Sequence, residues 1–455
     1  MVRTCADAYL CHDEPVRRVA RIGLWGLGAT ALLMVAVVTW YELTKFSGSE
    51  PQTAPLLLTG ATVLVGPDLD PEHRTSVLVD DGLIAAIGEE ADAAARPDTA
   101  RIDIAGLTLM PGLIDLHVHL GTARERGDRF GLADYPQVIA NAMRYEPQAR
   151  RALLGSGVTS VRSLGNEVPW ILELRDMVDS ADLAGPRIFA AGPVFTTQGG
   201  HPVVTLHGGT VHEGLVRVPG TPREATAEVR ALAEQGVDVI KVIQERGGGQ
   251  MVLDPLPTDV LGAIVTEAHR RDLTVTAHWG TPEDLAEVLV AGVDGLEHLE
   301  AREFLPGWPE DVLADLVKRQ VPVTTTMVVV EVSAPEEAMR QLRGIVGDFH
   351  AAGGRIVAGS DAGMPGVPFG GALHRELELL VEVGMTPQEA LRAATSDAAD
   401  VIGSDAVGVI EVGRSADLVA VDGDPLTTIT DAARIELVLR DGVIVVDRAA
   451  DVPAR

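Results

Sequence analysis

Apolar runs of strand length alternate with amphipathic, helix-like stretches through the middle of the chain. The segments at 222–236 and 256–272, for example, have the apolar spacing of surface helices. This alternation is typical of α/β proteins, and eight units predict a (β/α)8 TIM barrel. A doubly wound open sheet fits it too, but no Gly-x-Gly-x-x-Gly follows the first run. The eight runs lie at 107–119, 157–165, 187–196, 237–243, 273–280, 293–300, 321–330 and 355–363.

Shorter strand-like runs with turn signals occur near both ends of the chain. Asp81-Gly82 and Asp441-Gly442 each separate two such runs, as in two-residue β-hairpins. Because the two ends have similar patterns, we expect them to pair into one small β-sandwich beside the barrel. The expected parts are a tail (1–21), an apolar segment (22–41), a linker (42–55), the first part of the sandwich (56–108), the barrel (109–403) and the second part of the sandwich (404–455).

The apolar segment at 22–41 contains no charged side chain. As a helix it would be about 30 Å long, which is enough to cross a bilayer. Arginines precede it and only Lys45 follows closely, so the tail is expected in the cytoplasm. We therefore predict a single-pass anchor in the cell membrane with the main body of the chain outside. The alternative is a signal peptide cleaved at Ser47-Gly48-Ser49, which would give a secreted protein.

Composition narrows the possible partners and chemistry. The formal net charge of −29 argues against nucleic-acid binding and is typical of an acidic, soluble exterior. The two cysteines, Cys5 and Cys11, precede the apolar segment, so the body of the protein has neither a disulfide nor a thiolate ligand. The sequence leaves the oligomeric state open, a homo-oligomer included.

Metal-ligand residue types stand near the ends of several predicted strands. His117 and His119 are two residues apart, so in a strand both imidazoles point to one side and suit a divalent metal. Taken alone, a His-x-His pair is more often structural. The argument rests on the whole set, because barrel active sites lie at the carboxyl ends of the strands. The further members are Lys241, His278, His298 and Asp361.

Lys241 lies inside an apolar run, where desolvation lowers the pKa of an amine. A neutral amine reacts with carbon dioxide to give a carbamate, whose two oxygens suit a bridge between two metal ions. The alternative is a lysine that reaches the barrel rim or pairs with an acid.

The segments LMPGLIDLHVHLG, VIKV, TAHWG, LEHLE and GSDAG resemble the amidohydrolase superfamily. Within it they are similar to the binuclear, imidazolonepropionase-related branch that includes Xaa-Pro dipeptidase-like members. Residues 374–399 resemble the last helices of that branch, and the resemblance extends over about 56–447.

The resemblance implies two divalent metal ions, with zinc favoured and manganese or iron as alternatives. His117, His119 and Asp361 would bind one ion, and His278 and His298 the other. A carbamate on Lys241 would bridge the two ions. Asp361 would pass a proton from the attacking water to the leaving amine.

Three further residues are predicted to contact substrate. His201, in a Gly-Gly-His segment like that of the branch, would polarise the substrate carbonyl, or else be a structural loop histidine. Arg246 would bind a substrate carboxylate, and Gly248 would allow close backbone approach. The loop arginines Arg124, Arg126 and Arg129 are alternatives for the carboxylate.

The expected activity is hydrolysis of a small amide or peptide C–N bond, as in a dipeptidase or an N-acyl amino acid hydrolase. Hydrolysis of a cyclic amide or imidazolone ring is the enzymatic alternative. Deamination is a weaker hypothesis, because mononuclear deaminases of the superfamily lack a lysine at the position of Lys241. A ligand-binding relative without activity is the alternative from another class, and metal titration would distinguish it.

Overall fold

The computed structural model describes residues 34–36, 38–40, 45–48, 54–121, 135–205, 213–248, 251–299 and 307–448, without the side chains of 135–144 and 213. Most of the predicted membrane segment at 22–41 lies outside these residues. Among the helices of the described part, none combines the length and apolar character needed to cross a bilayer. The membrane anchor therefore stays a prediction.

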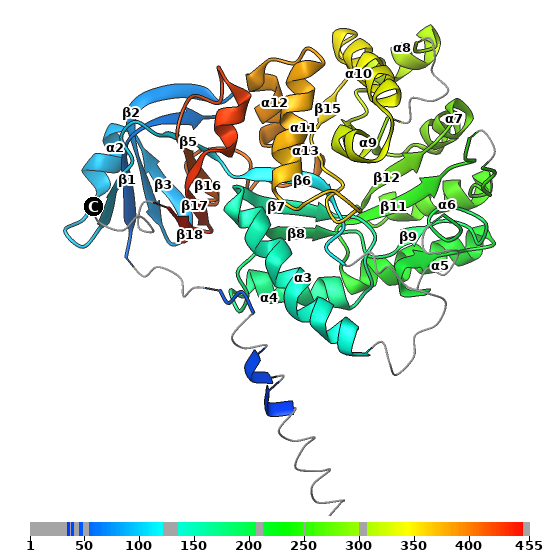
Figure 1. Cartoon of the computed structure of the whole chain (residues 1–455), viewed down its shortest axis with the longest axis horizontal. Helices are drawn as coiled ribbons and strands as arrows, with labels where there is room; N and C mark the ends of the chain where they lie inside the picture. The colour runs from blue at the N-terminus through cyan, green and yellow to red at the C-terminus, as the bar shows by residue number, and fades with distance from the viewer. Residues whose placement is uncertain are drawn as a thin grey trace, which may run out of the picture.

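Parallel strands form the centre of the larger part of the protein, between β6 and β15 (Figure 1). Three strands make one sheet: β6 (Leu113–Val118), β7 (Val158–Ser163) and β8 (Arg187–Ala190). A second parallel sheet has the order β10-β9-β11-β12-β13-β14-β15. Its strands are β9 (Val194–Phe195), β10 (Val216–Arg217), β11 (Val239–Gln244), β12 (Thr274–Trp279), β13 (Gly295–Glu297), β14 (Val323–Thr324) and β15 (Ile356–Val357).

Backbone hydrogen bonds connect the two parallel sheets at both edges. Asp238, just before β11, donates its N–H to the Ala190 carbonyl of β8 at 2.8 Å. After β15, Ala358 accepts from the N–H of Leu116 at 3.1 Å, and Asp361 donates to the carbonyl of His117 at 2.7 Å. The carboxyl ends of distant strands are thereby brought to one place. The parallel α/β fold expected from the alternation is confirmed.

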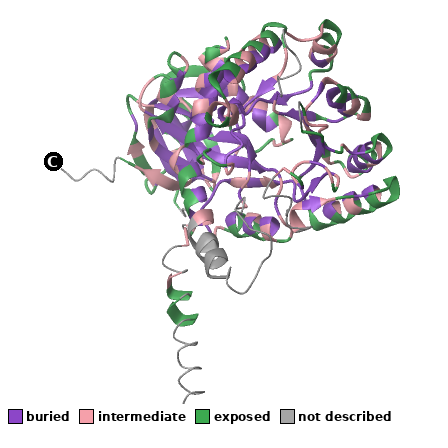
Figure 2. Ribbon diagram, turned by 45° about the vertical axis from the view of Figure 1, so that its right-hand side comes forward, coloured by how far each residue is buried: buried purple, intermediate pink, exposed green. Residues whose placement is uncertain are grey.

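Helices cover the outer faces of these sheets, and buried residues gather on the strands and on the inward faces of the helices (Figure 2). Local sequence fixes several helix ends. α7 begins with a capping box between Thr281 and Asp284 and ends at Gly292, whose φ of 86° suits glycine. The helices are α3 (Tyr135–Gly155), α4 (Trp170–Asp179), α5 (Pro222–Gln235), α6 (Thr258–His269), α7 (Pro282–Ala291), α8 (Glu310–Arg319), α9 (Met327–Ser333), α10 (Glu336–Ala351), α11 (Gly371–Glu382), α12 (Pro387–Ala393) and α13 (Ser396–Val401).

Strands from both chain ends form a separate eight-stranded sheet. β16 (Leu418–Val421) pairs antiparallel with β5 (Thr108–Pro111) and joins the two halves. Asp81-Gly82 and Asp441-Gly442 form the two predicted hairpin turns, with positive φ at all four residues. The other strands are β1 (Leu56–Val65), β2 (Asp70–Asp80), β3 (Leu83–Ile87), β4 (Ala100–Asp103), β17 (Ile435–Arg440) and β18 (Val443–Asp447), and α2 (Glu89–Ala94) follows β3.

The prediction of one continuous strand at 321–330 is wrong. Only β14 is extended there, and the valine run that follows belongs to α9. Thr326 turns the chain with a φ of 46°, and the buried carboxylate of Glu376 accepts hydrogen bonds from the N–H groups of Met327 and Val328. This tertiary contact overrides the preference of β-branched residues for strands.

Candidate active site

A cavity of about 260 Å3 lies at the carboxyl ends of the parallel strands. It contains every residue predicted as a metal ligand, together with His201. Ten apolar or proline side chains form most of the remaining wall. The predicted ligands among its lining residues are His117, His119, Lys241, His278, His298 and Asp361.

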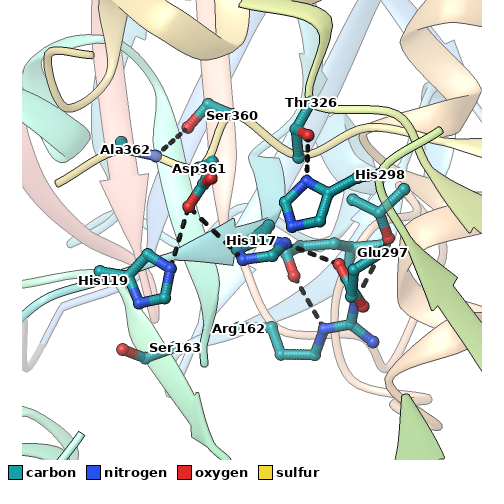
Figure 3. Close-up of polar contacts among 12 residues, drawn as sticks. His117, His119, Arg162, Ser163, Glu297, His298, Thr326, Ser360, Asp361 and Ala362 are labelled. Carbon is teal, nitrogen blue, oxygen red and sulfur yellow. Dashed lines mark hydrogen bonds and ion pairs between the residues drawn. The ribbon is translucent and has the colours of Figure 1, made fainter. Parts of the chain in front are cut away.

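Asp361 stands between His117, in β6, and His119, just beyond the end of that strand (Figure 3). Its Oδ1 atom is 2.9 Å from Nε2 of His119 and 3.5 Å from Nε2 of His117. One potential ligand atom each of His117, His298 and Asp361 lies within 4.8 Å of the others. The carboxylate and the imidazoles are therefore close enough to share one cation.

The other histidines continue the row across the cavity. The ring centroids of His117 and His298 are 4.8 Å apart, and those of His298 and His278 are 4.9 Å apart. His201 stacks on His278 with centroids 5.1 Å apart. Glu245 lies at the same end, with Oε2 3.2 Å from Nε2 of His278. The arrangement brings four predicted ligand histidines and His201 into one cluster.

Unusual backbone angles place two of these residues. His298 follows β13 with a φ of 66°, and Asp361 has a φ of 55°. Asp115, fully buried beneath, accepts hydrogen bonds from the N–H and the hydroxyl of Ser360. It accepts another from the N–H of His117 at 3.2 Å. One carboxylate thus fixes the end of β6 against the segment that carries Asp361.

A buried ionic network orients His117 from behind. Oε2 of Glu297 is 2.7 Å from Nδ1 of His117, and Oε1 is 2.5 Å from Nη2 of Arg162. The hydroxyl of Thr276 also donates to Glu297. Burial opposes the charge of Glu297, but the guanidinium of Arg162 holds its pKa well below the usual value. Glu297 therefore stays ionised and can hold the Nδ1 proton of His117, which leaves Nε2 as a donor to a metal.

Lys241 is buried, and its Nζ atom has no hydrogen-bond partner among the described residues. Burial lowers the pKa of Lys241 to about 8 and that of His117 to about 4. Burial also holds the pKa of His298 well below its usual value. Neutral imidazoles with free lone pairs, an acidic side chain and an unpartnered amine fit a metal centre better than a dry structural cluster.

The three residues predicted to contact substrate separate into two groups. His201 lines the cavity, and its Nδ1 is 2.5 Å from the hydroxyl of Thr205. Arg246 does not line the cavity, because its guanidinium is bound to Asp284 and Glu287. Gly248 is exposed and is likewise absent from the cavity wall. The carboxylate-binding role expected of Arg246 is thus not supported.

The loop arginines Arg124, Arg126 and Arg129 lie outside the described residues. Sequence reasoning did not single out several residues that support the site: Asp115, Arg162, Glu245, Glu297 and Thr326. Among these residues, Glu297 is the one that directly precedes a predicted metal ligand, His298. This position in the sequence is a signal by which it could have been identified.

The comparisons with known proteins agree with this geometry. Residues 108–445 match the sequence model of the amidohydrolase family. The chain is 27% identical to an ochratoxinase of Aspergillus niger over 422 residues, covering 83% of each chain. It is 26% identical to an enamidase of Eubacterium barkeri over 395 residues, covering 83% of this chain and 91% of the relative.

Solved structures show the same likeness. A prolidase complexed with N-methylphosphonate-L-proline superposes with a TM-score of 0.70 at 27% identity, covering 86% of this chain and 99% of the other. A Xaa-Pro dipeptidase with bound methionine gives 0.69 at 26% identity, with the same coverage. The resemblance seen in the sequence motifs is thereby confirmed. The chain belongs to the amidohydrolase family and is a metal-dependent hydrolase of amide carbon–nitrogen bonds.

Proposed function

We propose that the protein is a binuclear metal hydrolase that cleaves a dipeptide or an N-acyl amino acid with an apolar side chain. The observation that carries this proposal is the convergence of four histidines, Asp361 and the unpartnered amine of Lys241 on one largely apolar cavity. The Xaa-Pro dipeptidase and prolidase structures, which share the fold over most of both chains, support the peptide-like substrate.

The residues divide into two sets of ligands. His117, His119 and Asp361 would hold one ion, and His278 and His298 would hold the other. A carbamate on Lys241 is proposed as the bridge, since the lowered pKa of this buried amine favours its neutral, reactive form. Zinc suits a histidine-rich set, and two such ions would polarise the scissile carbonyl and favour ionisation of water.

The side chains supply binding and proton transfer. Asp361 accepts a proton from the attacking water and delivers it to the leaving nitrogen. His201 keeps Nε2 for the substrate carbonyl, because its Nδ1 contacts Thr205. Burial lowers the pKa of His201 to about 3, so it acts as a neutral hydrogen-bond donor.

The cavity wall narrows the substrate class. Leu215, Ile243, Val330 and Leu342 are among the residues that line it, and Lys241 is the one lysine or arginine among its described lining residues. Its volume of about 260 Å3 is near the lower end for ligand sites. A small substrate with an apolar group beside the scissile bond fits these properties.

The test combines metal analysis with turnover of a panel of dipeptides and N-acyl amino acids, using the purified full chain. We expect about two metal ions per chain, and hydrolysis that is faster for apolar than for charged side chains. Lys241→Met should lose metal and activity, whereas Lys318→Met, on the exposed face of α8, should retain both. One ion per chain, or full activity of Lys241→Met, would refute the binuclear proposal, and turnover of cyclic amides alone would refute the proposed substrate.

The same proposal extends to architecture and location. The backbone bond from Asp238, just before β11, to β8 and the bonds between residues 358–361 and β6 support one closed (β/α)8 barrel. The eight-stranded sheet, with its own apolar cluster, supports a sandwich built from both ends. Attachment to the outer side of the cell membrane through 22–41 is proposed from the sequence alone, and membrane fractionation of the full chain would test it.

A further inference from the structure

A buried glutamate holds the turn that follows β14. Glu376 lies on α11 with no exposed surface, and its Oε1 accepts hydrogen bonds from the hydroxyl of Thr325 and the N–H of Met327. Its Oε2 accepts another from the N–H of Val328 at 2.8 Å. The N–H groups of Met327 and Val328 lie in the first turn of α9, where helix N–H groups lack partners within the helix. Glu376 therefore caps α9 from a neighbouring helix.

This arrangement frees a side chain that would ordinarily cap the helix itself. Thr326 occupies the N-cap position of α9, where threonine commonly accepts from the backbone two or three residues on. Its side chain makes no such bond. Instead, its hydroxyl lies 2.6 Å from Nδ1 of His298 (Figure 3). When Nδ1 carries the proton and donates to this hydroxyl, Nε2 is left free to bind a cation.

The same helix forms part of the cavity wall. Val329 and Val330 follow directly on α9 and line the cavity. Glu331, one residue further, is bound by Arg375 through two hydrogen bonds of 2.9 and 2.7 Å. Two consecutive residues of α11, Arg375 and Glu376, thus bind the second half and the start of α9. The helix that carries this part of the cavity wall and Thr326 is therefore fixed against α11.

We propose that Glu376 is a positioning residue: it caps α9 in place of Thr326, so that the Thr326 hydroxyl orients His298 towards the second metal position. The inference rests on the proposed function and goes beyond it, because Glu376 itself does not line the cavity. A glutamine of the same shape offers one carbonyl oxygen, and its NH2 group cannot accept from a backbone N–H. Glu376→Gln should therefore disturb the cap without removing bulk.

The test uses the full chain and four variants: Thr326→Val, Thr326→Ser, Glu376→Gln and the double variant Glu376→Gln/Thr326→Val. Glu378→Gln is the matched control, since Glu378 lies on the same helix and pairs with Arg375 at the surface. The measurements are metal content after dialysis against increasing chelator, the thermal midpoint, and kcat and KM for the best substrate.

We expect Thr326→Val and Glu376→Gln each to lose one of the two ions at roughly 10- to 100-fold lower chelator than the wild type. Thr326→Ser should restore retention, because it keeps the hydroxyl. The double variant should be no worse than the more affected single variant, since both changes break the same chain of contacts. Glu378→Gln should retain both ions.

Wild-type metal retention in Glu376→Gln, or independent losses that multiply in the double variant, would overturn the inference while leaving the proposed function intact. If Glu376→Gln does not fold, the Thr326 pair decides: equal metal loss in Thr326→Val and Thr326→Ser would overturn it. A wild-type chain without two ions would overturn both proposals.

Discussion

Replacing Glu297 with glutamine tests the ionic network behind the metal ligands. Glu297 has no exposed surface and accepts hydrogen bonds from His117, Arg162 and Thr276. In Glu297→Gln the guanidinium of Arg162 stays buried without its counter-charge. It keeps two neutral acceptors, the Leu116 carbonyl at 2.8 Å and the Thr324 hydroxyl at 3.2 Å. The variant therefore removes a charge while conserving volume.

Two separate losses are expected. Breaking a buried ion pair costs about 3–5 kcal/mol, which is a large share of a typical folding free energy of about 5–15 kcal/mol. The glutamine NH2 group, where it faces His117, requires Nδ1 to accept a hydrogen bond. The proton then moves to Nε2, the atom expected to bind the metal. Changes of this kind in residues behind metal ligands lower metal affinity by about 10–100-fold.

The assay is urea unfolding together with metal retention during chelator competition. Glu287→Gln is the matched control, because Glu287 also pairs with an arginine, Arg246, outside the cavity. It should lose some stability and retain both ions. Retention of metal in Glu297→Gln at wild-type chelator concentrations would refute the argument that this carboxylate sets the tautomer of His117.

Three other outcomes are expected. Asp361→Asn should abolish turnover while much of the metal stays bound, because it removes the proton acceptor; full activity on the substrate panel would contradict the mechanism. Arg246→Met should lower the free energy of unfolding by about 1–3 kcal/mol, since buried Asp284 loses its cation, and should leave KM unchanged; a tenfold rise in KM would restore its substrate-binding role. Burial lowers the pKa of His374, so its stabilising contribution is present above pH 6.5 and is lost as the pH falls towards the folded-state pKa. Urea unfolding between pH 7.5 and 5 should accordingly show a steeper loss in the wild type than in His374→Gln, and parallel curves would contradict this assignment.

The features of the fold that could be predicted are those that depend on residues close together in the sequence. The alternation of apolar runs and amphipathic segments indicated parallel strands with covering helices, and the two Asp-Gly turns are where the sequence placed them. The segment at 321–330 was misassigned because its valines favour a strand locally. Their helical conformation depends on Glu376, which lies about fifty residues further along the chain.

Some residues of the candidate site could likewise be identified from the sequence, and others could not. His117, His278 and Asp361 were found because strand ends can be located from hydrophobicity, and strand ends meet in space. Arg162 was missed because it is a single charge inside an apolar run, and its pairing with Glu297 is fixed only by the folded chain. The substrate-binding role of Arg246 stays a prediction, because a loop arginine looks the same in the sequence whether it faces a ligand or, as in this structure, an acidic helix.

The pairing of β5 with β16 has a consequence for synthesis of the protein on the ribosome. Strand β5 (Thr108–Pro111) pairs with β16 (Leu418–Val421), which is synthesised about 310 residues later. Until then, the edge of β5 that faces β16 has no partner strand. At about 5–20 residues per second, this edge is exposed for roughly 15–60 s. Unpaired strand edges readily recruit other chains. Until residues 418–421 have been synthesised, this edge is therefore open to pairing with other chains.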